Sequence, residues 1–281
     1  MQSLPRISVV TPSFNQAQYL PQTIHSVLDQ QYPNLEYIIM DGGSTDGSVD
    51  IIKHNANRLT SWESKRDKGQ ADAIYRGFEK STGDILCWIN SDDYFLKGAL
   101  THVAETFRRF PEAQWLIGGC VIVRASGKPI TKVYGYTPTF DSLLHAGMLF
   151  CQMSCFWRRE VFFKVGGFDT KLQFCFDYDL FLRLSQIGVP ATNHRILSAY
   201  RVQDASKTAT LLNTVGIKEK ELLQLKFGKG SYSAEQSRQI VETTQREIRR
   251  VQRLYYWFDA IRDPFFFAKS LGASIRDLFV K

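Results

Sequence analysis

Short continuous runs of hydrophobic residues alternate with helix-like apolar spacing over the first 110 residues of the chain. The continuous runs predict buried strands at residues 6–14, 35–40, 59–63 and 85–89. The spaced apolar positions predict helices at residues 21–30, 69–80 and 97–110, and one that starts near Ser48. Strand and helix alternating at this spacing indicate a parallel, doubly wound α/β sheet.

The pattern changes twice further along the chain. Between residues 111 and 212 it is less regular and predicts strands at residues 115–124, 130–136, 151–157 and 191–202. Helices are expected there at residues 140–147 and 177–186. From residue 213 the pattern is helical to the end. We therefore predict one domain over residues 1–212, in which helices flank a mixed sheet, and a helical extension over residues 213–281.

Each predicted strand of the first half ends in a polar loop. Right-handed crossovers between parallel strands bring such loops to one edge of the sheet. Ligands of open α/β sheets bind in the crevice at that edge. One site is therefore predicted from four loops, at residues 11–16, 41–47, 63–70 and 90–94.

Two adjacent carboxylates, Asp92 and Asp93, follow the apolar run at residues 85–89. Adjacent carboxylates repel each other unless a positive charge lies with them, and a hard divalent cation supplies that charge. Mg²⁺ or Mn²⁺ bound there would also bind phosphate oxygens. The alternative is a polar turn that caps the next helix, since Ser and Asp are common at helix N-termini.

The other loops offer further polar contacts. Residues 11–15 combine hydrogen-bond donors with an aromatic ring, which suits a base or a sugar, although a plain strand exit fits as well. Asp41 directly follows an apolar strand, so its carboxylate is a fixed acceptor for a base N–H or a ribose hydroxyl. Asp67 and Lys68 precede Gly69, which lets the backbone approach a ligand closely, with a solvated loop as the alternative.

The composition narrows the class of partner. Hydrophobic residues make up 44% of the chain, and the net charge of +7 favours an anionic partner: a nucleotide, nucleic acid or an acidic membrane. No basic run with interleaved aromatic residues occurs in the first half, which argues against nucleic acid. The usual dinucleotide and P-loop signatures, GxGxxG and GxxxxGK(S/T), do not occur. The five cysteines lack zinc-type spacing and are predicted to be buried free thiols in a reducing compartment.

The tail at residues 245–281 has a pattern of its own. Four apolar residues recur there at helical spacing: Ile248, Val251, Tyr255 and Phe258. Four arginines lie beside them: Arg246, Arg249, Arg250 and Arg253. Asp263 and Pro264 predict a break before a second helix. Basic amphipathic helices rich in aromatic residues lie in membrane interfaces, so we expect the tail to bind a membrane surface. The alternatives are a helical cap packed on the domain and a contact between copies of the chain.

Six segments occur in order along the chain: SVVTPSFNQ, MDGGSTDG, DKGQADAIYRG, GDILCWINSDD, CQMSCFWRREVFFKVGGFD and FDYDLFLRL. This ordered set, within about residues 5–208, resembles the inverting glycosyltransferases of family 2, which have the GT-A fold. The resemblance implies a Rossmann-like sheet with a nucleotide-binding half at about residues 1–110 and an acceptor half at about residues 111–212. It also implies that a sugar moves from a nucleotide-activated donor to an acceptor hydroxyl, with Mg²⁺ or Mn²⁺ as cofactor.

The resemblance further implies roles for single residues. Asp177 falls where the family keeps its catalytic base, whereas Asp179 has the smaller claim to catalysis. Asp92 and Asp93 fall in the metal-binding region, with Asp93 as the direct ligand and Asp92 beside ribose and metal. The residues expected to contact the donor are Thr11, Pro12, Asn15, Asp41, Asp67, Lys68, Asn90 and Asp92.

Two positions depart from the family pattern. The acidic residue that often precedes the base is Phe176 here, and a His often found in the YRxH stretch is Gln203, in YRVQDASKT. If that His helps to hold the metal in relatives, the metal affinity of this chain is lower or a water takes the place of the imidazole.

We therefore expect an inverting glycosyltransferase of bacterial surface polysaccharide or glycolipid synthesis, located in the cytoplasm at the inner face of the cell membrane. Its acceptor would be a glycan or a lipid-linked glycan, nucleic acid is not expected as a partner, and self-association is left open. One rival is a sugar-nucleotide-forming nucleotidyltransferase, which needs a Gly-rich basic loop where TPSFNQ stands. Another is a membrane-attached scaffold that binds a nucleotide sugar, and hydrolysis of a donor in the presence of Mn²⁺ would separate enzyme from scaffold.

Overall fold

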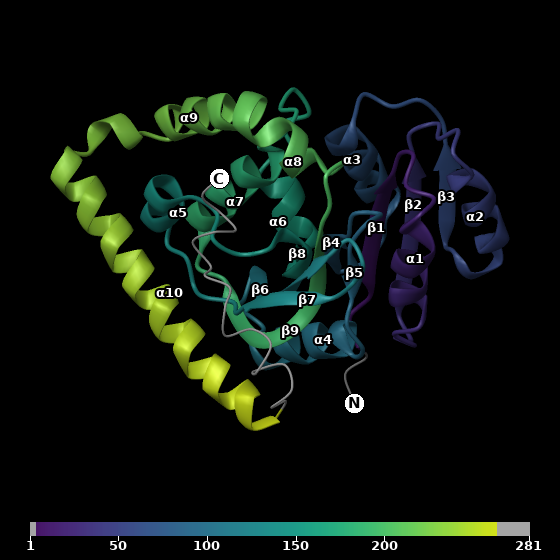
Figure 1. Cartoon of the computed structure of the whole chain (residues 1–281), viewed down its shortest axis with the longest axis horizontal. Coiled ribbons are helices and arrows are strands. Elements are labelled where there is room, and N and C mark those ends of the chain that lie inside the picture. Colours follow the sequence, from purple (N-terminus) through teal and green to yellow (C-terminus); the bar gives the residue numbers. More distant parts are fainter. Residues whose placement is uncertain (1–3, 263–281) are drawn as a thin grey trace.

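The computed structural model describes residues 4–262, with side chains to residue 258, and contains a nine-stranded sheet flanked by helices (Figure 1). The strands are β1 (Ile7–Ser13), β2 (Leu35–Asp41), β3 (Ser61–Ser64), β4 (Ile85–Trp88), β5 (Tyr94–Phe95), β6 (Trp115–Arg124), β7 (Pro129–Val133), β8 (Cys155–Arg158) and β9 (Ala191–Val202). The helices are α1 (Leu20–Leu28), α2 (Ser48–His54), α3 (Gln70–Lys80), α4 (Ala99–Arg109), α5 (Phe140–Ala146), α6 (Arg159–Lys164), α7 (Phe176–Ile187), α8 (Lys207–Leu211), α9 (Ile217–Lys226) and α10 (Ala234–Arg262).

The first half of the sheet is parallel, as predicted. β3, β2, β1 and β4 lie side by side in that order, so their carboxyl ends share one edge. β8 runs antiparallel between β4 and β6, and β6 pairs in parallel with β9. β7 pairs antiparallel with β6, and β5 pairs antiparallel with β9. The sheet is therefore mixed and flanked by helices, which confirms the predicted fold class.

The core lies on both faces of the sheet. On β4, Leu86 and Trp88 belong to the apolar cluster that includes α3 and α7, whereas Ile85 and Cys87 belong to the cluster that includes α1 and α4. Successive side chains of a strand point to opposite faces, so this division follows from the period of two. Because both faces are covered, the central strands appear in the sequence as continuous apolar runs.

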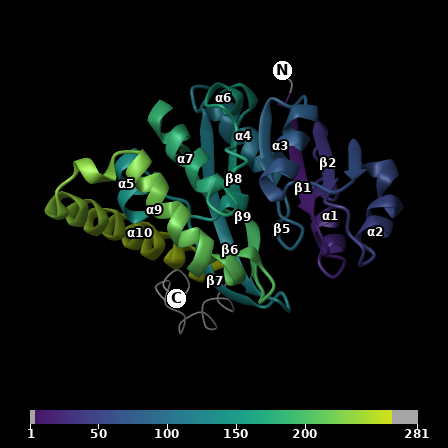
Figure 2. The same ribbon diagram turned by 90° about the horizontal axis from the view of Figure 1, so that it is seen from above.

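The chain after β9 forms a C-terminal extension of α8, α9 and α10. In Figures 1 and 2, α9 and α10 lie on the opposite side of the molecule from α1 and α2. α10 begins beside a reciprocal pair of hydrogen bonds, in which the Ser233 hydroxyl accepts from the backbone N–H of Gln236 and the side-chain Oε1 of Gln236 accepts from the backbone N–H of Ser233. This arrangement satisfies two backbone donors at the helix start.

One face of α10 packs on the domain. Ile248 and Val251 pack against the apolar cluster of α5 and α7, and the ring of Tyr255 stacks on His194 at 4.0 Å. For these three residues the structure thus shows the alternative of a helix packed on the domain. Phe258, the fourth apolar residue of the predicted face, is 54% exposed. Among residues 4–262, no helix is long and apolar enough to cross a membrane.

The structure differs from the sequence prediction at several elements. β5 was missing from the prediction because two residues carry no periodic pattern; only pairing with β9 makes it a strand. The run at residues 151–157 is a strand only from Cys155, and Gln152–Ser154 is a short 3₁₀ helix. Helix α8 begins at Lys207, before the predicted boundary at residue 212, and that division of the chain stays a prediction. All five cysteines are buried and free, as predicted.

Candidate active site

Hydrogen bonds join the loops that follow β1 and β2 at the carboxyl edge of the sheet. The backbone N–H of Asn15 donates to Ser44 Oγ at 2.8 Å, and Asn15 Oδ1 accepts from the N–H of Thr45 at 2.9 Å. Asn15 has a φ of 52°, in the left-handed region that Asn tolerates better than most residues. Asn15 therefore fixes the two loops to each other, and its predicted contact with a donor stays a prediction.

Asp41 lies at the end of β2, is 1% exposed, and has its partners inside the protein. Its Oδ2 accepts from the N–H groups of Gly43 and Ser44 and from the hydroxyl of Ser64 at 2.7–3.0 Å. Its Oδ1 accepts from the Ser44 hydroxyl at 2.6 Å. Asp41 therefore fixes the β2 loop to the end of β3, and a contact with a base or ribose stays a prediction.

Asp67 and Phe14 lie together against the bare backbone of Gly42. A Cβ atom built on Gly42 would lie 2.8 Å from Asp67 Oδ2 and 3.2 Å from Phe14 Cδ2, so glycine allows this approach. Phe14 is 61% exposed, and Asp67 Oδ1 accepts from the Gly69 N–H at 2.8 Å. An exposed aromatic ring can stack on a base, and a carboxylate beside it can accept hydrogen bonds from the N–H groups of that base.

Three other residues predicted to contact the sugar donor are Thr11, Pro12 and Lys68. Thr11 and Pro12 are buried, and Thr11 Oγ1 lies 3.0 Å from the hydroxyl of Tyr37 in the core. Lys68 is exposed, and its backbone N–H donates to Asp72 Oδ2. The fold thus brings Asn15, Asp41 and Asp67 to one edge, while the side chain of Thr11 faces the interior beneath it.

The turn after β4 presents Asp92 and Asp93 at the same edge. Asp93 is 1% exposed; its Oδ1 accepts from the backbone N–H of Arg201 at 2.9 Å and its Oδ2 from Asn90 Nδ2 at 3.1 Å. Asp92 is half-buried, and its Oδ2 accepts from Gln203 Nε2 at 2.7 Å. Gln203, the residue that departs from the family pattern, therefore contacts Asp92, one of the two predicted metal ligands.

Arg201 is the cation beside this pair. It is 3% exposed, and its Nε donates to the backbone carbonyl of Asp92 at 2.8 Å. Burial raises the pKa of Asp92, against the opposing effects of Gln203 and Arg201. Burial, followed by the charge of Asp92, raises the pKa of Asp93 well above its usual range. One arginine thus only partly compensates the charges of a buried and a half-buried carboxylate, and a further positive charge would stabilise their ionised forms.

The chemistry of these donors fits a hard divalent cation. Among residues 4–258, no group of three or more His, Cys, Asp or Glu side chains is arranged to hold a metal ion. Mg²⁺ in nucleotide-binding enzymes commonly uses one or two carboxylates, substrate phosphates and water, so a full protein cage is not required. Asp92 and Asp93 supply two such carboxylates, and the amide oxygen of Gln203 is a further ligand type that Mg²⁺ and Mn²⁺ accept.

Asp177 lies in the first turn of α7, next to a residue whose ring packs on the last residue of β4. The ring of the preceding residue, Phe176, lies 5.9 Å from the ring of Trp88, the last residue of β4. Asp177 Oδ1 accepts from the N–H of Tyr178 at 2.7 Å. Burial raises the pKa of Asp177 to about 6, while that hydrogen bond and the charge of Lys207 act in the opposite direction. A carboxylate with a pKa of this kind is suited to accept a proton near neutral pH.

Asp179 has a different environment. It is 1% exposed and forms ion pairs with Arg183 at 2.6 Å and with Lys226 at 3.3 Å. Arg183 also donates to the backbone carbonyls of Val165 and Gly167. Asp179 therefore ties α7 to the turn after α6 and to α9, which supports the structural role expected for it.

Three charged residues at the site lay outside the predicted set. Arg201 and Lys207 belong to the YRVQDASKT segment. Because this segment matches a stretch of the family pattern, both residues could have been predicted from the sequence. Lys207 Nζ lies 2.8 Å from the carbonyl oxygen of Gln173 and 5.8 Å from the ring centroid of Phe176. Burial lowers the pKa of Lys207, against the charges of Asp177, Glu219 and Asp67. Glu219 accepts hydrogen bonds from backbone N–H groups 44–46 residues earlier in the chain, and no local sequence pattern indicates such a contact.

Comparison with known proteins identifies the family of this chain. The family model described as Glycosyl transferase family 2 matches residues 8–166, which is more than half of the chain. The chain belongs to glycosyltransferase family 2. This glycosyltransferase is 31% identical over 153 residues to the putative teichuronic acid biosynthesis glycosyltransferase TuaG of Bacillus subtilis, over 52% of its own length and 60% of TuaG. The predicted family is thereby confirmed, and the match to the family model ends before Asp177.

Solved structures show the same fold. S. aureus TarS 1-349 in complex with UDP has a TM-score of 0.62 at 15% identity, over 85% of this chain and 70% of that one. The mannosyltransferase PcManGT from Pyrobaculum calidifontis, in complex with GDP-Man and Mn²⁺, has a TM-score of 0.57 at 16% identity, over 99% and 88% of the two chains. At these identities the likeness establishes the glycosyltransferase fold.

Proposed function

We propose that this family 2 enzyme moves a sugar from a nucleoside diphosphate donor to an acceptor hydroxyl by a single displacement that inverts the anomeric centre. The observation that carries the proposal is the contrast between the surroundings of two carboxylate centres. Asp92 and Asp93 are adjacent, half-buried and buried, and lie beside Arg201, whereas Asp177 belongs to α7 and has a pKa of about 6. Carboxyl groups whose surroundings differ in this way are suited to different tasks.

The donor nucleotide would lie over the loops after β1, β2 and β3. The exposed ring of Phe14 would stack on the base, and the adjacent carboxylate of Asp67 would accept from a base N–H. The complexes of TarS with UDP and of PcManGT with GDP-Man support a nucleotide at this edge.

Asp92 and Asp93 would hold Mg²⁺ or Mn²⁺, with Gln203 beside them, and the Mn²⁺ in the PcManGT complex supports this assignment. When bound, the cation neutralises charge on the departing diphosphate. Arg201 keeps the two carboxylates in place through its N–H to Asp93 and its guanidinium contact to the Asp92 carbonyl. Asn90 holds Asp93 from the other side and accepts from Gln70 at the start of α3.

Asp177 would act as the general base. Its carboxylate takes the proton of the acceptor hydroxyl while the hydroxyl oxygen forms a bond to the anomeric carbon. The bond from that carbon to the diphosphate oxygen breaks, and its electron pair leaves with the diphosphate. One displacement with one base inverts the centre, and no carboxylate nucleophile is needed.

A nucleotide screen followed by a transfer assay tests this function. Unfolding temperatures are measured with nucleoside diphosphates in Mn²⁺ and in EDTA, because a ligand that binds only the native state raises them. Donor turnover is then measured with the best nucleotide. A nucleotidyltransferase would instead release pyrophosphate from a nucleoside triphosphate and a sugar phosphate, and a scaffold would bind donor without turnover.

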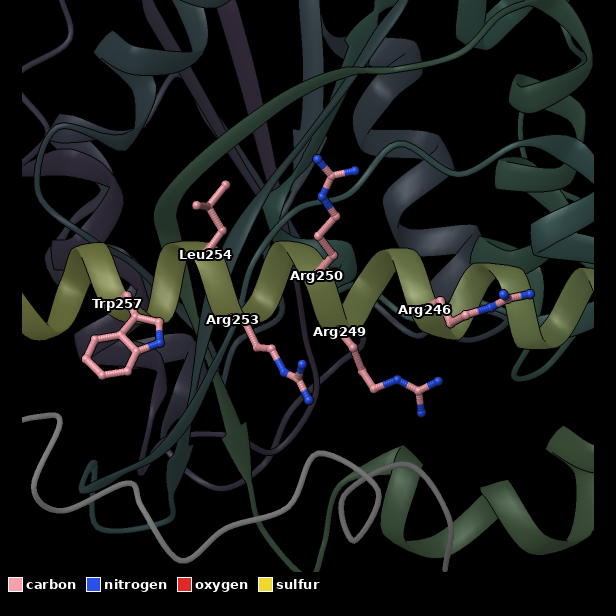
Figure 3. Close-up of a pocket in the computed structure, with 6 residues that line it drawn as sticks. All are labelled: Arg246, Arg249, Arg250, Arg253, Leu254 and Trp257. Carbon is pink, nitrogen blue, oxygen red and sulfur yellow. The ribbon is translucent and has the colours of Figure 1, made fainter.

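We further propose that the enzyme acts in bacterial surface-glycan synthesis at the inner face of the cell membrane. The teichuronic acid role in the name of TuaG supports the pathway class. On α10, four arginines, Leu254 and Trp257 line an open hollow of about 470 Å³ (Figure 3). Leu254 and Trp257 are 50% and 66% exposed. Arginines interleaved with exposed apolar side chains suit an anionic lipid surface.

The residues proposed for this membrane contact differ from the stripe that packs on the domain. Ile248, Val251 and Tyr255 pack on the protein, so the apolar contact with lipid is assigned to the exposed side chains of Leu254, Trp257 and Phe258. The predicted second helix, after Pro264, lies outside the described residues. Self-association through α10 would be the competing outcome, and a measurement of the molar mass in solution distinguishes it from membrane binding.

A further inference from the structure

The backbone before Asp177 is held by a carboxylate from the C-terminal extension. Glu219 of α9 accepts from the N–H groups of Gln173, Phe174 and Cys175 at 2.7, 2.9 and 2.8 Å. Cys175 immediately precedes the first residue of α7, and no side-chain cap of its own satisfies this end of the helix. The side chain of Glu219 instead accepts from three consecutive N–H groups of the loop before the helix, and the last of them belongs to the N-cap residue, Cys175.

Two further contacts from the extension hold the same loop. The Cα of Gly216 lies so close to the Phe174 ring that a Cβ there would be 2.8 Å from a ring carbon. Lys207 Nζ donates to the backbone carbonyl of Gln173 at 2.8 Å. An anion thus holds the loop's N–H groups and a cation holds its carbonyl, so the loop's position depends on α8 and α9.

From these contacts we infer that Glu219 is a positioning residue for the reaction: it fixes the loop at residues 173–175 and thereby sets the place and the charge environment of Asp177. The inference rests on the proposed role of Asp177 as general base. It gives the C-terminal extension a part in catalysis that is separate from any contact with a membrane.

The charged and titratable groups that face Asp177 come from several elements. Lys207 of α8 stabilises its charged form, and Glu219 of α9 opposes that form. The thiols of Cys155, at the start of β8, and Cys175 also lie within reach of its charge. Removing the charge of Glu219 should therefore lower the pKa of Asp177, since a like charge nearby raises the pKa of a carboxyl group.

The test is Glu219→Gln, measured for kcat, for donor KM and for the pH dependence of kcat. We expect kcat to fall about 10- to 100-fold, the loss that a small misplacement of a reacting group causes, with donor KM within about twofold. The midpoint of the acid limb of the kcat profile should move to lower pH. Glu221→Gln, an exposed residue of the same helix, is the matched control and should leave kcat and the midpoint unchanged.

Gly216→Ala separates the effect of the loop's position from the effect of the charge on Glu219. It displaces Phe174 while Glu219 keeps its charge, so kcat should fall and the acid midpoint should stay in place. If Glu219→Gln does not fold, Gly216→Ala alone decides: a kcat equal to that of the unmodified enzyme would overturn the inference. An unchanged kcat and midpoint in a folded Glu219→Gln would overturn it as well. Loss of transfer in Asp177→Asn alongside either result would leave the proposed function standing.

Discussion

The donor side and the base side of the proposed site are held in different ways. On the donor side, successive strands of one parallel sheet end at one edge, and their loops bond to each other through Asn15 and Asp41. On the base side, Asp177 lies in the first turn of a helix whose preceding loop is held by Lys207 and Glu219, from α8 and α9. The donor side is thus a consequence of the sheet, whereas the base side also requires the C-terminal extension.

If Asp177 is the base, as proposed, this difference makes the extension part of the catalytic unit. Its helix α9 holds the loop before Asp177, pairs with Asp179 through Lys226, and bonds to α5 through Gln224, which donates to the Leu144 carbonyl. A truncation that removes α9 would therefore damage the base side of the site while leaving the strand-end loops intact. Substitutions that keep the helices are the sharper way to compare the two sides.

Asp177→Asn gives the largest expected effect. The amide cannot accept the acceptor's proton, so kcat should fall by about 10²- to 10⁴-fold with donor binding retained. Transfer within about tenfold of the unmodified enzyme would remove Asp177 from the mechanism. Asp179→Asn is the control, because it breaks a buried ion pair and should lower the free energy of unfolding by about 3–5 kcal/mol.

Charge reversal on α10 tests whether the extension also binds lipid. Arg249→Glu with Arg253→Glu removes two cations, each worth about 1 kcal/mol at an anionic surface, so the affinity for phosphatidylglycerol vesicles should fall at least about 30-fold. Binding of the unmodified enzyme should weaken with salt, since exposed charges are screened over about 8–10 Å. Lys53→Glu with Arg58→Glu, near α2, is the charge-matched control, and equal losses in both pairs would refute the α10 surface.

The pH dependence of kcat should report the base side alone. With a pKa of about 6, Asp177 is protonated below that pH and cannot accept a proton, so kcat should fall about tenfold per unit on the acid side. Donor affinity is measured by calorimetry at each pH, so that titration of Asp92 and Asp93 is seen separately. A kcat that stays constant from pH 7 to pH 4.5 with donor saturating would exclude an ionised Asp177 as the base.

The same comparison explains how much the sequence could predict. The strands of the first half and the edge position of Asp92 and Asp93 follow from local apolar runs, each of which ends in a polar loop. Asp177 was found only through the resemblance to a family, because a helix start with two aspartates has no distinctive period. Glu219 could not be found, since its partners lie 44–46 residues earlier and only tertiary packing brings them together. The apolar stripe of α10 was visible in the sequence, but whether lipid or protein covers it depends on the fold.

Calorimetric binding of the donor nucleotide to Asp93→Asn and Asp177→Asn tests the separation of the two centres most directly. The titrations use the nucleotide found in the screen, with Mn²⁺ and with EDTA. The account predicts that Asp177→Asn binds as the unmodified enzyme does, more tightly with Mn²⁺ than in EDTA. It predicts that Asp93→Asn loses that difference while its unfolding remains cooperative. Equal affinity in Mn²⁺ and EDTA for the unmodified enzyme, or loss of the metal effect in Asp177→Asn but not in Asp93→Asn, would contradict it.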